Sequence, residues 1–410
     1  MTPEAPEAPK TSRVGALLAQ AGIAIDQLVF SAITFALQIV AALVSDLADF
    51  GVFSLIAIVQ IGQWYLGRAL TAEPLLVSQT AGDDRKLRGA GATSLAFGLL
   101  VGAVCALVAI PFGGLTRDLL LIQAVVAPFT AVLDHSRYVL YAKKRAGTAI
   151  ALDASWLGLF IAVAAVWSVV GKLSATTTYL VWALAAVPVT LAAVAVTVTP
   201  LALSHVREWL KEQRKLIPGF LIDAAYLTIS TWATFGVALI VTGADGLGLL
   251  RKALIPVTAL IVLFIGISNS LLAHLAGRSA REVIRPPVMI AGLAAVVCAV
   301  TAVLLLVLPD SLLTLALGTP WDQLQTVVLI LLGYAFLQTS AQAAMVAAKA
   351  TGRAWLGPRV RTVEFCFEVG LGAALGVAFG VVGIAIGMTA AWLIANAFAW
   401  LGLLRGRSDG

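Results

Sequence analysis

Long apolar runs separated by short charged breaks extend along the whole chain. A bilayer core needs about twenty apolar residues per helix, so the pattern predicts twelve membrane-spanning helices. Their ranges are 17–44, 52–80, 90–111, 118–142, 148–170, 177–200, 217–242, 249–275, 286–308, 323–348, 356–379 and 382–404. Most breaks are charged, such as GDDRKLR, KKRAG and HVREWLKEQRK. The weakest is Gly380-Val381-Val382-Gly383, between the last two spans.

Composition agrees with this pattern. Hydrophobic residues make up 60% of the 410 residues and charged residues only 12%, whereas soluble domains carry about 25% charged residues. The predicted fold class is an all-α polytopic membrane protein. The Pro/Glu-rich start, MTPEAPEAPKTSR, predicts a disordered cytoplasmic tail over residues 1–16. The apolar run that follows is too long for the core of a signal peptide, so we expect it to remain as the first span.

The basic residues fall almost entirely on one side of the predicted membrane. With the N-terminus inside, 21 of the 27 Lys and Arg residues lie in inner segments, and the outer loops hold only Arg117 and Lys172. By the positive-inside rule this predicts that both termini are cytoplasmic. It also accounts for the net charge of +6 without a nucleic-acid partner. The resemblance described below implies that this membrane is the plasma membrane, which in bacteria is the inner membrane.

One stretch occurs twice. Residues 25–55 align without a gap on residues 222–252, and Asp26, Thr34 and Gly51 fall on Asp223, Thr231 and Gly248. Six spans per half give both halves the same direction, so the pattern predicts a parallel repeat of two six-helix lobes; the resemblance described below implies that the lobes surround a central cavity. The predicted units are an N-terminal lobe over 17–202, an amphipathic cytoplasmic linker over 203–216, a C-terminal lobe over 217–405 and a tail over 406–410.

No pattern indicates an enzyme, a cofactor or a metal site. The three histidines are scattered, no Gly-rich phosphate loop is present, and the outer loops are short. The three cysteines lie inside apolar runs without metal-ligand spacing. The chain is therefore predicted to be a transporter that is not an enzyme.

Ionisable residues inside apolar spans are costly and are candidates for function. Arg68 lies about 24 Å into the second span, so it must face a cavity or pair with an acid such as Glu73 or Asp26. Glu73-Pro74 should kink that helix. Asp26 and Asp223 lie toward the cytoplasmic side, where they are either helix-start acids or functional groups. Asp26, Asp223 and Glu73 are the candidates for coupling or gating.

Other charges have a local explanation. Asp134 and Arg137 are three residues apart and are expected to pair on one helix face. Glu364 and Glu368 are expected to pair locally with the nearby residues Arg359 and Arg361. Arg251 and Lys252 open the eighth span from outside, either as interface anchors or as the outer end of a basic path for an anionic head group.

Several segments resemble a known family. These are Phe50-Gly51 before the second span, RYVLYAKKRAG after the fourth, AKATGRAW before the eleventh and GVVGIAIGMTAAWLIANAFAWLGLLRGR at the end. The chain resembles the lipid-linked oligosaccharide flippases of O-antigen and capsule pathways, which share a superfamily with lipid II flippases and multidrug and toxin extrusion transporters.

The resemblance implies alternating access and an undecaprenyl-diphosphate-linked oligosaccharide as substrate. It implies that basic residues of the cavity meet the diphosphate, for which the candidates are Arg68, Arg137, Arg251 and Lys252. Bilayer lipids, and a glycan polymerase or glycosyltransferases, are the expected partners. The lobes would rock about the repeated helix pairs.

Three alternatives remain open at this stage. One is a cation-coupled multidrug and toxin antiporter of the same fold, with Asp26 and Asp223 as protonatable groups. Another is a major-facilitator transporter, although GDDRKLRGAG lacks the spacing of that class's inner-loop signature. The third is a non-transporting partner of a glycan-assembly complex.

Overall fold

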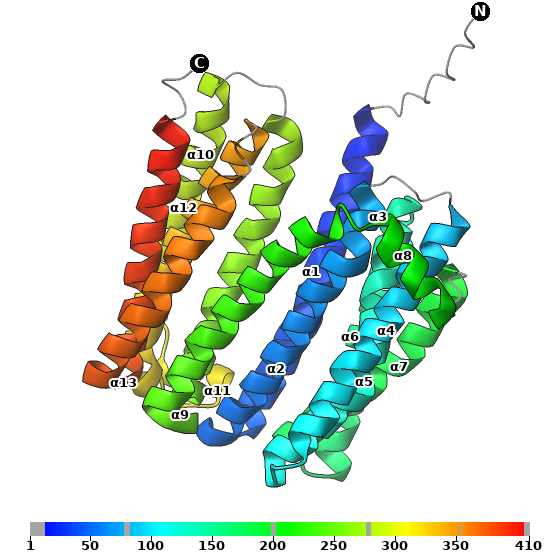
Figure 1. The fold of residues 1–410 in the computed structure, drawn as a ribbon. Coiled ribbons are helices and arrows are strands. Elements are labelled where there is room, and N and C mark those ends of the chain that lie inside the picture. Colours follow the sequence, from blue (N-terminus) through cyan, green and yellow to red (C-terminus); the bar gives the residue numbers. More distant parts are fainter. Residues whose placement is uncertain are drawn as a thin grey trace, which may run out of the picture.

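A computed structural model of the chain describes residues 13–77, 83–197, 202–275, 280–351, 353 and 355–405, with side chains apart from those of 13–21, 24 and 265–282. The described chain is helical and contains no strand (Figure 1). The first residues of the tail expected over 1–16 and all of the tail over 406–410 lie outside these ranges. The first helix begins at Arg13, earlier than predicted.

The first half of the chain forms one group of packed helices, here called the N-terminal lobe. It comprises α1 (Arg13–Val44), α2 (Leu47–Gly67), the π-helix η1 (Arg68–Ala72), α3 (Glu73–Val77), α4 (Asp84–Ala109), α5 (Gly114–Ala142), α6 (Ala146–Val170) and α7 (Ala175–Thr197). The main contacts join α4 to α5, α5 to α7, α1 to α6 and α2 to α5.

The second half forms the C-terminal lobe, preceded by two short linking helices. In order these elements are η2 (Leu203–His205), α8 (Val206–Glu212), α9 (Ile217–Leu275), α10 (Ala280–Val307), α11 (Asp310–Leu317), α12 (Trp321–Ala350) and α13 (Leu356–Arg405). Helix α12 packs on α9, α10 and α13. Helix α9 also packs along α2, so α2 and α9 join the two lobes (Figure 1).

Two helices are too long to cross a bilayer once. Helix α9 has 59 residues and α13 has 50, whereas a span needs about twenty. Both bend back at a glycine with positive φ, Gly243 (φ 72°) and Gly380 (φ 62°), a conformation that glycine adopts without steric penalty. Ten helices of the described chain are long and apolar enough to cross a membrane. Because α9 and α13 each supply two spans, the twelve predicted spans all have counterparts.

Three local predictions were wrong. The second helix does not begin at residue 52, the start of the predicted span 52–80, because Asp46 caps α2 by accepting a hydrogen bond from the Asp49 N–H (2.8 Å) and α2 begins at Leu47. The interval between the predicted spans 217–242 and 249–275 is helical apart from Gly243. The outer loop before the tenth span holds a short helix, α11, which the sequence pattern did not predict.

Candidate functional site

The π-helix η1 gives Arg68 its position. The backbone N–H of Glu73 bonds to the carbonyl of Arg68, five residues back, which widens the helix for one turn. Pro74 follows and has no N–H for the carbonyl of Leu70, four residues back. The indole N–H of Trp209, on α8, donates to that carbonyl instead (2.9 Å). The structure therefore has a π-helix directly before Glu73-Pro74, where the sequence predicted a kink. This turn contains Arg68, and the linker between the lobes caps it.

Arg68 is held by an acid on another helix. Its Nε and Nη2 donate to the two oxygens of Asp134 at 2.8 and 2.7 Å, a bidentate geometry that fixes the guanidinium plane. The rings of Phe30 and Tyr138 flank it at 5.4 and 5.5 Å. The prediction that Arg68 pairs with an acid is confirmed, but the partner is neither Glu73 nor Asp26.

Arg137 lies behind Arg68 and collects three carboxylates. Its Nη2 donates to Asp26 (2.7 Å), its Nη1 lies 3.1 Å from Asp134, and its Nε lies 2.9 Å from an oxygen of Asp153. The Tyr141 hydroxyl donates a short hydrogen bond to the Asp26 oxygen that Arg137 also contacts. The predicted pairing of Asp134 with Arg137 is confirmed, and the contacts of Arg137 with α1 and α6 were not predicted.

We call this group the N-lobe charge cluster; it comprises Arg68, Arg137, Asp26, Asp134 and Asp153. The cluster holds three carboxylates and two guanidinium groups, so its formal charge is −1. Asp26 Oδ1 and both oxygens of Asp153 are buried and have no hydrogen-bond partner among the described residues, because the contact of Asp153 with Arg137 is an ion pair without hydrogen-bond alignment. A buried charge is costly unless it is paired, so this site suits one additional proton or monovalent cation.

Exposure separates the two arginines. The side chain of Arg137 is fully buried, whereas that of Arg68 is 15% exposed. In this conformation the Arg68 side chain keeps some accessible surface, whereas that of Arg137 has none. The role of Arg137 in binding diphosphate therefore stays a prediction that needs a rearrangement. Sequence reasoning gave no role to Asp153, although a lone acid within an apolar span is a signal of function.

The repeated acids have different surroundings. Asp26 is buried in the N-lobe charge cluster, whereas Asp223 is exposed. Glu73, which is half-buried, interacts electrostatically with Asp223, with Arg68 and with Lys349 from the end of α12. Charged groups of both lobes therefore meet at the end of α2 that carries Arg68.

Lys252 joins the lobes at the opposite end. Its Nζ donates to the carbonyls of Ser45 (3.3 Å) and Gly318 (3.2 Å) and to Thr319 Oγ1 (3.0 Å). Arg251 reaches Gln38 on α1 (3.4 Å). Both basic side chains are buried, so their interpretation as exposed interface anchors was wrong. A role on the path of an anionic head group stays a prediction.

The repeated glycines bring the two lobes into backbone contact. A Cβ atom on Gly51 would clash with the carbonyl of Ala244, and a Cβ atom on Gly248 would clash with the carbonyl of Leu47. Leu47 and Ala244 are themselves equivalent positions of the repeat. The contact between α2 and α9 is thus a pseudo-two-fold crossing in which each repeated glycine admits the other lobe's backbone. We call it the glycine crossing.

A second group of buried acids lies in the C-terminal lobe. Glu364 accepts a hydrogen bond from Ser230 (3.0 Å), and Glu368 accepts one from Thr234 (2.8 Å). Arg361 lies 3.9 Å from Glu364, which confirms local pairing for that acid. For Glu368 the prediction was wrong, because it has no ion pair among the described residues and its Oε2 has no hydrogen-bond partner there.

The arrangement of helices is that of a known group of transporters. No family model and no curated protein sequence matches the chain. Solved structures do match it. An inward-facing multidrug resistance MATE family transporter of the MOP superfamily aligns with TM-score 0.73 and 14% identity over 95% of this chain and 98% of that chain.

Two further structures give similar results. An outward-facing conformation of a MATE family transporter aligns with TM-score 0.66 and 14% identity over 98% of each chain. The lipid II flippase MurJ in an inward closed conformation aligns with TM-score 0.73 and 11% identity over 94% of this chain and 87% of that chain. The chain is therefore a multi-pass membrane protein with the fold of MOP superfamily transporters.

Proposed function

We propose that this chain moves an undecaprenyl-diphosphate-linked oligosaccharide across the bacterial inner membrane by alternating access, and that it is not an enzyme. Arg68 is the observation that carries the proposal. A guanidinium has five N–H donors, and Asp134 holds the group from one side through Nε and Nη2. The other N–H groups of Arg68 remain for a ligand. Of the two arginines in the N-lobe charge cluster, Arg68 is the one with exposed surface. A fixed, partly exposed arginine suits a diphosphate.

The two lobe contacts suggest how access alternates. In this conformation Lys252 and the glycine crossing hold the lobes together at the predicted outer end. Separating the lobes there breaks the hydrogen bond between Lys252 and the Ser45 carbonyl and opens the glycine crossing. The diphosphate would bind beside Arg68 from the cytoplasmic side and leave after this separation, while the lipid tail stays in the bilayer. Both termini are cytoplasmic in this scheme.

A specific observation favours a second candidate, a cation-coupled multidrug and toxin antiporter of the same fold. The formal charge of −1 on the N-lobe charge cluster, with the unpartnered oxygens of Asp26 and Asp153, gives a coupling ion or proton a place to bind. Glu368 in the C-terminal lobe offers another. Coupling is also compatible with a flippase, so the substrate distinguishes the candidates. A third candidate, a non-transporting member of a glycan-assembly complex, predicts no translocation.

The test uses glycan display in cells that depend on this chain. We expect Arg68→Ala to abolish display at normal protein level, because the substrate anion loses its fixed partner. Arg68→Lys should restore display only in part, since an ammonium cannot make the bidentate contact. Arg88→Ala, which removes an exposed arginine from α4, is the matched control and should display normally.

The outcomes separate the candidates. Wild-type display from Arg68→Ala would remove Arg68 from the mechanism. Resistance to cationic drugs that requires this chain and is lost in Asp26→Asn, with no effect on glycan display, would favour the antiporter instead.

A further inference from the structure

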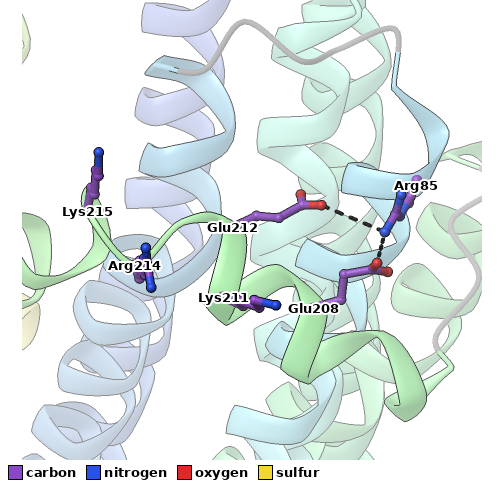
Figure 2. A pocket seen from close by; sticks show the side chains of 6 residues that line it. All are labelled: Arg85, Glu208, Lys211, Glu212, Arg214 and Lys215. Atoms are coloured by element: carbon purple, nitrogen blue, oxygen red, sulfur yellow. Dashed lines mark ion pairs between the residues drawn. The ribbon is translucent and has the colours of Figure 1, made fainter.

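A pocket at the start of α4 and along α8 has no role in the function proposed above. Its volume is about 520 Å³, and its lining residues are Arg85, Glu208, Lys211, Glu212, Arg214 and Lys215. Figure 2 shows these six side chains around the short linker helix. The pocket lies where the chain passes from the last span of the N-terminal lobe to the first span of the C-terminal lobe.

The charges of the pocket are not balanced. Both acids point to Arg85, which forms an ion pair with Glu208 and lies 4.0 Å from Glu212 (Figure 2). Lys211, Arg214 and Lys215 are exposed and have no ion-pair or hydrogen-bond partner in the described part of the chain. Three cations therefore remain for an anionic ligand.

The same linker also exposes apolar side chains. Leu203 and Leu210 are 51% and 40% exposed, which is unfavourable in water. Trp209, on the same helix, is buried against α4 and η1. A short helix with one buried aromatic residue, exposed leucines and several cations fits the boundary between head groups and acyl chains. A soluble anion would leave the leucines in water, whereas a lipid covers them.

We propose that this pocket binds the phosphate-bearing head group of an anionic phospholipid of the inner leaflet, with the acyl chains against Leu203 and Leu210. Trp209 connects the site to transport, because its indole N–H caps the Leu70 carbonyl in η1, next to Arg68. A lipid bound on α8 therefore steadies the linker that holds η1 in place. The inference does not depend on which substrate the chain moves.

The first experiment measures lipid binding. The purified full chain is mixed with phosphatidylglycerol or phosphatidylcholine, and retained lipids are counted by native mass spectrometry. We expect preferential retention of phosphatidylglycerol. The triple variant Lys211→Gln, Arg214→Gln, Lys215→Gln should reduce it about fivefold per side chain removed, since each cation near an anionic surface contributes about 1 kcal/mol.

The matched control removes the same charge from the same end of the bundle. Arg88→Gln, Lys144→Gln, Arg145→Gln changes three exposed cations on α4 and at the turn between α5 and α6, and it should bind phosphatidylglycerol like the wild type. Equal binding by the pocket variant and the wild type would overturn the proposal. Displacement of the lipid by soluble glycerol phosphate at similar concentration would also overturn it, because the site would then recognise a free anion.

A second measurement tests the link to transport. In liposomes of phosphatidylcholine alone, the wild type and the pocket variant should move substrate at equal rates. Added phosphatidylglycerol should accelerate the wild type and the control but not the pocket variant. Equal acceleration of all three chains would contradict the link. If the proposed substrate is wrong, transport fails in every chain while the difference in lipid binding persists.

Discussion

Replacing Gly248 by alanine should disfavour the conformation described above. Gly248 lies on α9 against the first residue of α2, and a Cβ atom there would be 2.7 Å from the carbonyl carbon of Leu47 and closer still to its oxygen. Ordinary contact begins at 3.4 Å, so the methyl group intrudes by at least about 0.7 Å. The neighbouring atoms are backbone and cannot turn away as a side chain could.

The size of the shift between the two conformations follows from the free-energy cost of overpacking. Inserting a methyl group into a close-packed contact costs about 1–3 kcal/mol, and this cost arises only when the outer ends of the lobes touch. The gain in helix propensity from alanine applies equally to both conformations and cancels. The ratio of outward-open to inward molecules should therefore rise about 5-fold to 150-fold. Gly51→Ala should act in the same direction, because it meets Ala244 in the equivalent position.

The assay measures the distance between the lobes at their outer ends. Spin labels at Arg117→Cys on α5 and Asp310→Cys on α11, both exposed positions, are introduced after replacement of Cys105, Cys298 and Cys366. Gly248→Ala should shift the distance distribution to longer values. The control is Gly236→Ala, on the same helix, where a Cβ atom meets nothing within 4 Å. Identical distributions for the wild type, Gly248→Ala and Gly236→Ala would refute the role of the glycine crossing.

Two further predictions concern buried charges. Arg137→Met leaves the carboxylates of Asp26, Asp134 and Asp153 without their shared cation, so the free energy of unfolding should fall by about 3–5 kcal/mol. Thermal unfolding in detergent measures this loss, and Asp153→Asn in the same chain should recover part of it. An unchanged Tm for Arg137→Met would contradict the pairing. Lys252→Met removes the hydrogen bond from Lys252 Nζ to the Ser45 carbonyl, which joins the two lobes at the outer contact, so the same spin labels should report more outward-open molecules. An unshifted distribution would exclude Lys252 as an outer contact between the lobes.

The spans could be predicted from the sequence because each depends on a local property, a run of about twenty apolar residues. The predicted ends of the helices were less accurate, because side chains that cap a helix with hydrogen bonds set where it begins. Asp83 accepts hydrogen bonds from the N–H groups of Arg85 and Lys86, so α4 begins at Asp84, six residues before the predicted span. The predicted break at Gly380 is confirmed, because α13 bends there at positive φ, a conformation that only glycine adopts readily.

The site could be predicted only where its contacts are local. Asp134 and Arg137 lie one turn apart, and their pairing follows from helix geometry. Arg68 with Asp134 and Arg137 with Asp26 are separated by 66 and 111 residues, and no single sequence specifies such contacts. The repeat gave a wrong indication as well, because it implies that Asp26 and Asp223 have equal surroundings, whereas Asp26 is buried and Asp223 is exposed. At the repeat offset, Arg137 corresponds to Tyr334, so the second lobe has no cation there to bury its acid.

The most direct test of the central claim is translocation in proteoliposomes that contain only this chain and a fluorescent undecaprenyl-diphosphate-linked oligosaccharide. The fraction of glycan that becomes accessible to a membrane-impermeant quencher is followed over time. We expect faster translocation by the wild type than by protein-free liposomes, and a rate at background for Arg68→Ala. Translocation by the wild type at the protein-free rate, in proteoliposomes that do move a cationic drug, would contradict the claim.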